Sequence, residues 1–233
     1  MAISHSHKFG QIIGDLLELA ITPHLENFVK DKNLFLDKKG DRTARKGKKV
    51  TWIDNHGNKH DLDFVIERNG SDVKIGQPVA FIESAWRRYT KHSRNKAQEI
   101  QSAIIPLRDK YSGNSPFIGV VLAGVFTNGA LKQLESLGFN VLYFTYDSVI
   151  KSFAKYGIDA SFDEKTTEDS FAEKISAWEK SVHKHDIAKF LFEINKENVN
   201  SFFSSLELSI SRKIEQVLIL PLHGQQQNIS TIV

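Results

Sequence analysis

Residues 117–126 read FIGVVLAGVF, an almost unbroken apolar run that is typical of a strand buried on both faces. Asn128-Gly129 then opens a helix that continues through Leu137 and stops at Gly138, because glycine accepts the backbone conformation found just after a helix. Residues 140–146, NVLYFTY, predict a second strand. Strand, helix and strand with short connections form a βαβ crossover, so this stretch predicts a parallel or mixed sheet.

The residues before this unit predict a helix, a basic loop, a hairpin, a buried strand and a second helix. Apolar residues recur every three or four positions in both helices, and a turn rich in Asn and Gly joins the two hairpin strands. We expect Ser93 to cap the second helix and Pro106 to kink or break it. The predicted ranges are Phe9–Val29 (helix), Lys38–Lys49 (loop), Val50–Asp54 and His60–Glu67 (hairpin), Pro78–Glu83 (strand) and the helix from Ser93.

From Asp159 onward the pattern is mostly helical and more polar. The fold class that we predict is therefore α/β, with a central mixed β-sheet flanked by helices and a helical C-terminal extension. We expect residues 1–158 to form the core and residues 159–233 to pack on it. The elements predicted in the extension are helices at Glu168–His183 and Glu197–Lys213, a strand at Val217–Leu222 and a loose tail from Gln225.

Composition excludes several classes of protein and site. The 233 residues are 40% hydrophobic and 25% charged, an ordinary globular balance, and no apolar run reaches the roughly 20 residues of a membrane span. The first ten residues lack the apolar stretch of a signal peptide, so we expect a cytoplasmic protein without membrane contact. Cysteine is absent, which excludes disulfides, thiolate metal sites and cysteine nucleophiles.

The formal net charge is only +3, but the basic residues cluster in two stretches. Seven lie between Asp37 and Lys49, and a second group follows Glu83. Such clustering suits a polyanion binder, and two solvated surface segments are the alternative. The candidates for contact with nucleic acid are Arg42, Arg45, Lys46, Arg87, Arg88, Lys91 and Arg94.

Two carboxylates on neighbouring strands are candidates for a metal site. Asp63 lies in the second hairpin strand and Glu83 ends the next predicted strand, and neighbouring strands lie about 5 Å apart. Two hard oxygen ligands so placed suit a divalent cation. A structural ion pair of Glu83 with Arg87 or Arg88 is the alternative, and we expect Asp61 to lie at the surface.

These residues resemble the motifs of the PD-(D/E)XK nuclease superfamily, the restriction-endonuclease-like fold. Leu62-Asp63-Phe64-Val65-Ile66 is similar to the first motif and Glu83-Ser84-Ala85 to the second, and the order of predicted elements matches from Phe9 to Tyr146. Two positions depart from the pattern, because Leu62 replaces the proline of the motif and Ala85 its lysine.

The resemblance implies that a lysine on the following helix replaces the missing motif lysine, since some members of the superfamily carry it there. Ser93-x-Asn95-Lys96-x-x-Glu99 is similar to that arrangement, and Lys96 and Glu99, three residues apart, share one helix face. Lys91 is the second candidate for this role.

The resemblance implies an Mg²⁺-dependent endonuclease that hydrolyses phosphodiester bonds of double-stranded DNA, with Mn²⁺ as a substitute metal. Asp63 and Glu83 would hold the metal, and Lys96 and Glu99 would complete the catalytic set. The size of the chain is similar to that of a type II restriction endonuclease. A possible homodimer is a further expectation from this resemblance. Two alternatives stay open: a catalytically silent DNA-binding protein on the same fold, and a structure-specific repair or recombination nuclease.

Overall fold

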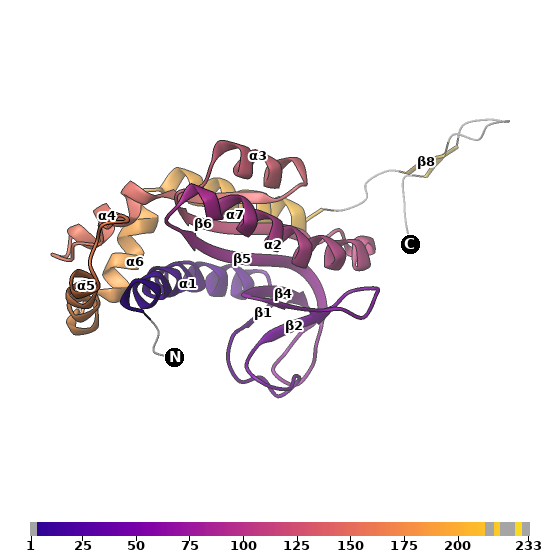
Figure 1. The fold of residues 1–233 in the computed structure, drawn as a ribbon. Coiled ribbons are helices and arrows are strands. Elements are labelled where there is room, and N and C mark those ends of the chain that lie inside the picture. The colour runs from indigo at the N-terminus through magenta and orange to yellow at the C-terminus, as the bar shows by residue number, and fades with distance from the viewer. Residues whose placement is uncertain (1–3, 213–216, 220–226, 230–233) are drawn as a thin grey trace.

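A five-stranded mixed sheet forms the centre of the molecule in the computed structural model, which describes residues 4–212, 217–219 and 227–229 (Figure 1). The strand order is β1-β4-β5-β6-β7; β4 pairs antiparallel with β1 and β5, and β6 pairs parallel with β5 and β7. The predicted α/β class with a mixed sheet is therefore confirmed. The strands are β1 (Phe35–Lys38), β4 (Phe64–Arg68), β5 (Gln77–Arg87), β6 (Phe117–Gly124) and β7 (Asn140–Thr145).

Helices cover both faces of this sheet, and each face has its own apolar core. One core lies under α1 (His5–Asp31) and the C-terminal helices, and the other under α2 (Thr90–Lys110) and α3 (Asn128–Ser136). Alternation along β6 supplies both cores, because Val121 faces the first and Val120 and Leu122 the second. The C-terminal helices are α4 (Tyr146–Ala154), α5 (Glu168–Lys180), α6 (Lys184–Glu193) and α7 (Lys196–Ile210).

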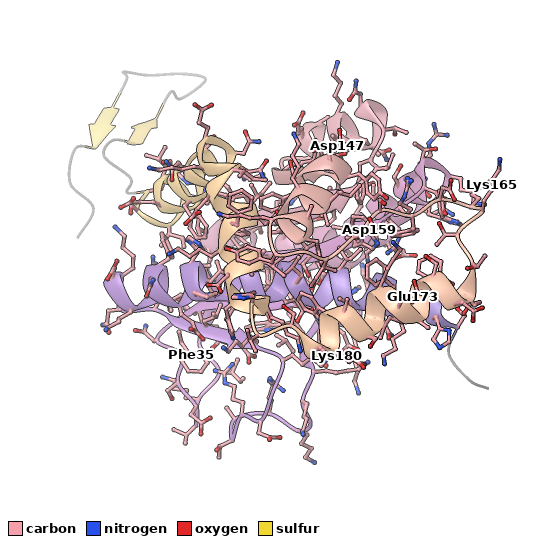
Figure 2. All side chains as sticks on the ribbon, turned by 90° about the vertical axis from the view of Figure 1, so that its left-hand side faces the viewer. Phe35, Asp147, Asp159, Lys165, Glu173 and Lys180 are labelled. Atoms are coloured by element: carbon pink, nitrogen blue, oxygen red, sulfur yellow. The ribbon has the colours of Figure 1, made fainter. Side chains whose placement is uncertain are left out.

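The C-terminal helices share the core of the sheet. Phe171 and Trp178 of α5 are buried in one cluster with Phe9 of α1, and α5, which carries the labelled Glu173 and Lys180, runs beside α1 in Figure 2. The predicted helices at Glu168 and Glu197 are confirmed, whereas the separate helix α6 was not predicted. Within the described part of the chain, no helix has both the length and the apolar character needed to cross a bilayer.

Near the C-terminus, β8 (Val217–Ile219) pairs antiparallel with β9 (Gln227–Ile229). The predicted strand that starts at Val217 is confirmed through Ile219, and its last three residues lie outside the described residues. The expectation of a loose tail is wrong for residues 227–229, which form β9.

The predicted strand His60–Glu67 is divided at Asp63, which corrects the expected hairpin. Residues before the bend form β3 (Lys59–Leu62), which pairs with β2 (Val50–Ile53) in a small separate sheet, and residues after it form β4. The chain changes sheets at this point because Leu62 is buried in one core and Phe64 in the other. The bend places the Asp63 side chain at the rim of the main sheet.

Two further boundaries differ from the prediction. Strand β5 continues past Glu83 to Arg87, since Ala85 and Trp86 are buried, so that Glu83 lies within the strand and not at its end. Helix α2 starts at Thr90 and runs through Pro106 without a break. Ser93 does not cap the helix; its hydroxyl is buried and donates to the Thr90 carbonyl (2.8 Å).

The loop between β1 and β2 is held by a buried ion-pair network. Arg42 donates to both carboxylate oxygens of Glu67 (2.6 and 2.9 Å) and lies 2.8 Å from Asp37 Oδ2, and its side chain is 3% exposed. Arg45 lies 3.2 Å from Asp37 Oδ1. The prediction that Arg42 and Arg45 contact DNA is therefore corrected, because their guanidinium groups neutralise carboxylates inside the fold.

We expect Arg42→Ala to lower the free energy of unfolding by about 3–5 kcal/mol, the usual effect of breaking a buried pair from one side. The change leaves the fully buried Glu67 carboxylate with a single hydrogen bond, from the Gly76 main chain (2.6 Å). Urea titration measures the loss. The control is Lys46→Ala on the same loop, where the exposed side chain predicts a change within about 0.5 kcal/mol. Equal stability of the two variants would contradict the prediction.

Candidate functional site

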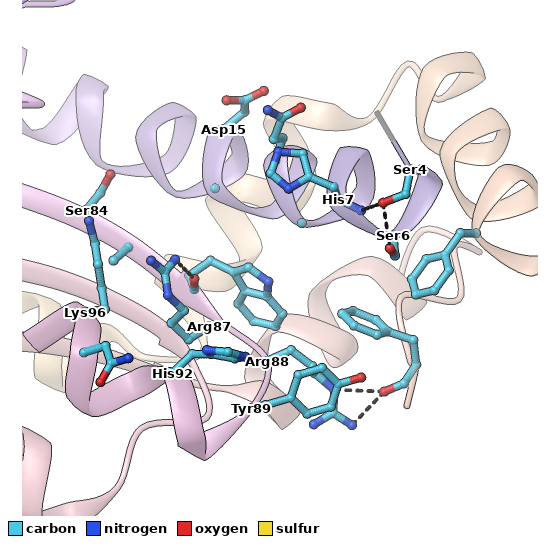
Figure 3. A pocket seen from close by; sticks show the side chains of 18 of the residues that line it. Ser4, Ser6, His7, Asp15, Ser84, Arg87, Arg88, Tyr89, His92 and Lys96 are labelled. Carbon is cyan, nitrogen blue, oxygen red and sulfur yellow. Dashed lines mark hydrogen bonds between the residues drawn. The ribbon is translucent and has the colours of Figure 1, made fainter. Parts of the chain in front are cut away.

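A cleft of about 1270 Å³ opens between α1 and the start of α2 (Figure 3). Asp63 and the C-terminal part of β5 line it, and the segment from Phe162 to Glu168 lines its far end. The charged side chains that line the cleft are Asp15, Glu18, Lys39, Asp63, Arg87, Arg88, Lys96, Glu99, Asp163, Glu164 and Glu168, and the other polar ones are Ser4, Ser6, His7, Gln11, Ser84, Tyr89, His92, Asn95 and Thr166.

Asp63, which lines this cleft, and Glu83 beneath it are neighbours, as the sequence predicts. Glu83 Oε1 accepts a hydrogen bond from the Asp63 main-chain N–H (3.2 Å). In return, Asp63 Oδ2 accepts from the main chain (2.7 Å) and the hydroxyl (2.8 Å) of Ser84. These reciprocal bonds fix the bend between β3 and β4 against β5 and hold the two carboxylates as neighbours.

The Glu83 carboxyl group is almost fully buried, at 8% exposure, and lies beneath the surface of the cleft. Burial raises its pKa to about 8, the negative charge of Asp63 adds to the rise, and the ammonium of Lys96 opposes it. The alternative of a structural ion pair is not observed, since neither Arg87 nor Arg88 forms a salt bridge with Glu83 in the described structure. Two crowded carboxylates with too little positive charge around them form a site that attracts a cation.

We expect the metal-free protein to lose stability as the pH rises from about 5 to about 8. The pKa of Glu83 is 4.5 in its ordinary state and about 8 in the folded protein. Between these values the folded protein binds a proton that the unfolded chain has released, so the free energy of unfolding falls as the pH rises, in total by a few kcal/mol. Thermal unfolding in chelator from pH 5 to 9 measures this dependence.

The matched variant for that measurement is Glu83→Gln, which is neutral at every pH. In this variant the free energy of unfolding should decrease less as the pH rises, and the variant should be more stable than the wild type at pH 9. An unchanged pH dependence in Glu83→Gln would show that protonation of Glu83 does not cause the loss of stability. Adding Mg²⁺ should stabilise the wild type most at high pH, where the carboxylate is ionised without competition from the proton.

Glu18 of α1 joins this pair, and the sequence analysis missed it. Its pKa is raised to about 6 by burial first, then by the charges of Asp63 and Asp15, against the opposing charge of Lys39. The signal in the sequence was a polar stripe on an otherwise apolar helix, in which Glu18 follows Asp15 by three residues. Only the packing of α1 beside β5 shows that this stripe faces Asp63.

Lys96 of α2 approaches the carboxylates from the other side. Its side chain is 20% exposed and points toward the strand that carries Ser84 (Figure 3). Its ammonium lies 3.3 Å from Glu99 Oε2, one turn further along the helix. Glu83 faces α2 because residues two apart in a strand share one face, and its neighbours on that face, Phe81 and Ala85, pack in the α2 core. The predicted grouping of Lys96 and Glu99 with the carboxylates is thus present.

The residues fit a divalent metal of the hard type. No group of three His, Asp or Glu side chains within the described residues is close enough to form a complete metal cage. Mg²⁺ does not need one, since it keeps several waters and binds proteins through one or two carboxylates. Asp63 and Glu83 would supply these, and Glu18 adds negative charge nearby.

The basic residues after Glu83 divide into two groups. Arg88 is held within the fold: its Nε and Nη2 atoms donate to the Phe162 carbonyl (2.8 and 2.6 Å), and its guanidinium lies 3.9 Å from the Tyr146 ring centroid. These contacts anchor the far wall of the cleft, and the predicted contact of Arg88 with DNA stays a prediction, because Arg88 also lines the cleft. Arg87 is half-buried, donates to the Trp86 carbonyl and lies 3.8 Å from Glu99.

Lys91, Arg94 and Lys46 remain available at the surface. All three are exposed, and none forms a salt bridge with a residue that the structure describes. Lys91 and Arg94 lie in the first turns of α2, beside the cleft residues His92 and Asn95. Asp61 is at the surface as expected, paired with Lys49 (2.6 Å).

Comparison with protein-family models gives no match, and neither does comparison with curated protein sequences. Among solved structures, a crystal structure of a protein of unknown function, AF1548, is similar to 80% of this chain and 99% of its own, with 12% sequence identity and a TM-score of 0.35. A similarity of that size assigns neither fold nor function to the chain.

Proposed function

We propose that this chain is an Mg²⁺-dependent endonuclease that hydrolyses phosphodiester bonds of double-stranded DNA. One observation carries the proposal: Asp63 lines a cleft with Lys96 and lies beside the buried Glu83, although burial and mutual repulsion make two neighbouring carboxylates unfavourable without a cation. The resemblance to the PD-(D/E)XK superfamily rests on these same residues.

The chain's own groups have separate tasks in this reaction. Asp63 and Glu83 would hold the metal, which would supply Lewis-acid polarisation of the phosphate and a lowered pKa of water. Lys96 orients the attacking water and offsets negative charge that develops on the phosphate, while Glu99 fixes the direction of the Lys96 side chain. Arg87, Lys91 and Arg94 bind backbone phosphates on the α2 side of the cleft.

The loop between β1 and β2 offers a second line of phosphate contacts. Lys46 is exposed on this loop, and Lys39 lines the cleft opposite α2. The Arg42 network fixes the loop, so its lysines meet DNA from a rigid support. A homodimer would place two such clefts on the two strands of one duplex, the arrangement needed for a double-strand break.

Incubation with bacterial genomic and phage DNA in Mg²⁺ or Mn²⁺, followed by sequencing of the ends, tests the proposal. Discrete fragments with a shared end sequence would support a type II restriction enzyme. A ladder without shared ends would favour the structure-specific nuclease. Salt-sensitive DNA binding without any cut in either metal would overturn the proposal in favour of the silent DNA-binding protein.

A further inference from the structure

A second, shallower groove of about 610 Å³ runs along α2 next to the cleft. His60 of β3 forms one side, and α2 forms the other with Asn95, Gln98, Glu99, Ser102 and Ala103. Asn95 and Glu99 line both the groove and the cleft. A duplex seated in the cleft would therefore continue into the groove.

Three side chains of α2 present unused hydrogen-bonding groups to this groove. Asn95, Gln98 and Ser102 are exposed, and their spacing of three and four residues places them on one helix face. None of their side chains makes a hydrogen bond within the described residues. Gln101, on an adjacent face, is by contrast bonded to Gln133 (3.2 Å).

The opposite wall of the groove is fixed in place. Asp54 accepts from the main chains of His56 (2.8 Å) and Asn58 (2.9 Å), and its Oδ2 lies 3.0 Å from His60 Nε2. Lys110, at the end of α2, donates to the Ile53 carbonyl (2.7 Å) and so ties the β2–β3 hairpin to the helix. A rigid groove of this kind selects its ligand without the loss of entropy that ordering a loop requires.

The charges around the groove indicate what it binds. Lys91 and Arg94 are exposed and without salt bridges to described residues. Arg94 directly precedes Asn95 on α2 and Lys91 lies one turn before it, while the exposed Glu99 is the one acidic side chain among the described residues that line the groove. This arrangement suits a DNA duplex: the two cations would meet the outer phosphates, and the amide and hydroxyl groups would meet the base edges that lie further inside. An α-helix about 10–12 Å across also fits the major groove, which is about 12 Å wide.

We propose that the exposed face of α2 formed by Asn95, Gln98 and Ser102 reads base edges in the major groove, next to the phosphate that the cleft residues cut. The proposal rests on the proposed function and adds sequence selection to it. Asn and Gln side chains pair with the N6 and N7 atoms of adenine through two hydrogen bonds, and a Ser hydroxyl donates or accepts. The recognition sequence should accordingly contain adenine opposite Gln98 or Asn95.

A protein partner is the less suitable occupant of this groove. Protein interfaces are centred on aromatic and large apolar residues, and Ala103 is the sole apolar residue among those lining the groove. A partner protein would also have to neutralise Lys91 and Arg94.

Selection from a duplex library with a randomised segment tests the proposal. The chain carries Glu83→Gln to disable cleavage, and bound DNA is sequenced with and without a second change, Gln98→Ala or Asn95→Ala. The parent should prefer one base roughly tenfold or more at one or two positions, and each second change should remove that preference at one position. Asn200→Ala on α7, an exposed amide on the opposite face of the sheet, is the matched control and should keep every preference.

Identical base preferences in the parent and in both α2 variants would overturn the proposal. Salt-sensitive binding by the parent without any base preference would also overturn it, and would leave the proposed nuclease intact. Failure of the parent to bind any duplex would overturn the proposed function as well.

Discussion

If the proposed reaction takes place at this cleft, Asp63→Asn should lower the rate of Mg²⁺-dependent DNA cleavage by on the order of 10³-fold or more, because it removes a charge that would bind the metal. The fold should survive the change, since the asparagine oxygen still accepts from the Ser84 main chain, as Asp63 Oδ2 does now (2.7 Å). DNA binding should stay the same or become tighter, because a negative charge facing the phosphates is lost. Nicking of supercoiled plasmid measures cleavage, and a gel-shift assay in chelator measures binding.

Asp61→Asn is the matched control for this prediction. Asp61 is two residues away in the chain, but its side chain is exposed and bonded to Lys49 and Thr51. It should cleave at the wild-type rate. Full cleavage by Asp63→Asn, or an equal loss in both variants, would show that the metal-dependent reaction does not occur at this cleft.

Lys96→Met should lower the single-turnover cleavage rate by roughly 10²-fold or more, because it removes the cation that, in the proposed reaction, offsets the developing phosphate charge. Methionine keeps the aliphatic part of the side chain, which packs where the half-buried lysine now lies. The change also leaves Glu83 without the Lys96 charge that lowers its pKa, so the optimum for cleavage should move to higher pH. A rate measured against pH at saturating enzyme separates this effect from binding.

Lys91→Met is the matched control on the same helix. Lys91 is exposed in the first turn of α2 and does not line the cleft, so its loss should weaken binding and reduce the salt dependence by about one phosphate contact. A loss of rate in Lys91→Met with normal turnover in Lys96→Met would move the lysine role to Lys91. Full activity in both variants would mean that cleavage needs neither lysine.

The observed start of α2 changes which lysine lies in the first turn of the helix. With Ser93 as the cap, Lys96 falls in the first turn of its helix, where a cation opposes the helix dipole. The helix instead starts at Thr90, so Lys91 has that position and Lys96 lies in the second turn. The case for Lys96 now depends on its direction toward Ser84 and on its electrostatic effect on Glu83.

The elements whose pattern is local could be predicted from the amino-acid sequence. The apolar run at residues 117–126, the helix that stops at Gly138 and the strand after it are present as β6, α3 and β7, because burial on both faces leaves a continuous apolar run. That Asp63 and Glu83 are neighbours could also be predicted, because each carboxylate adjoins a run of buried apolar residues in the sequence, and a buried carboxylate needs a partner.

Which charged side chains form ion pairs inside the fold depends on tertiary contacts. Arg42 and Lys46 are four residues apart in one basic loop, yet Arg42 is buried against Glu67 and Lys46 is exposed. Glu18 belongs to the cleft because α1 packs beside β5, far from it in sequence. Periodicity shows which face of an element is apolar, but the partner of a charged side chain depends on contacts between distant segments, which no local pattern records.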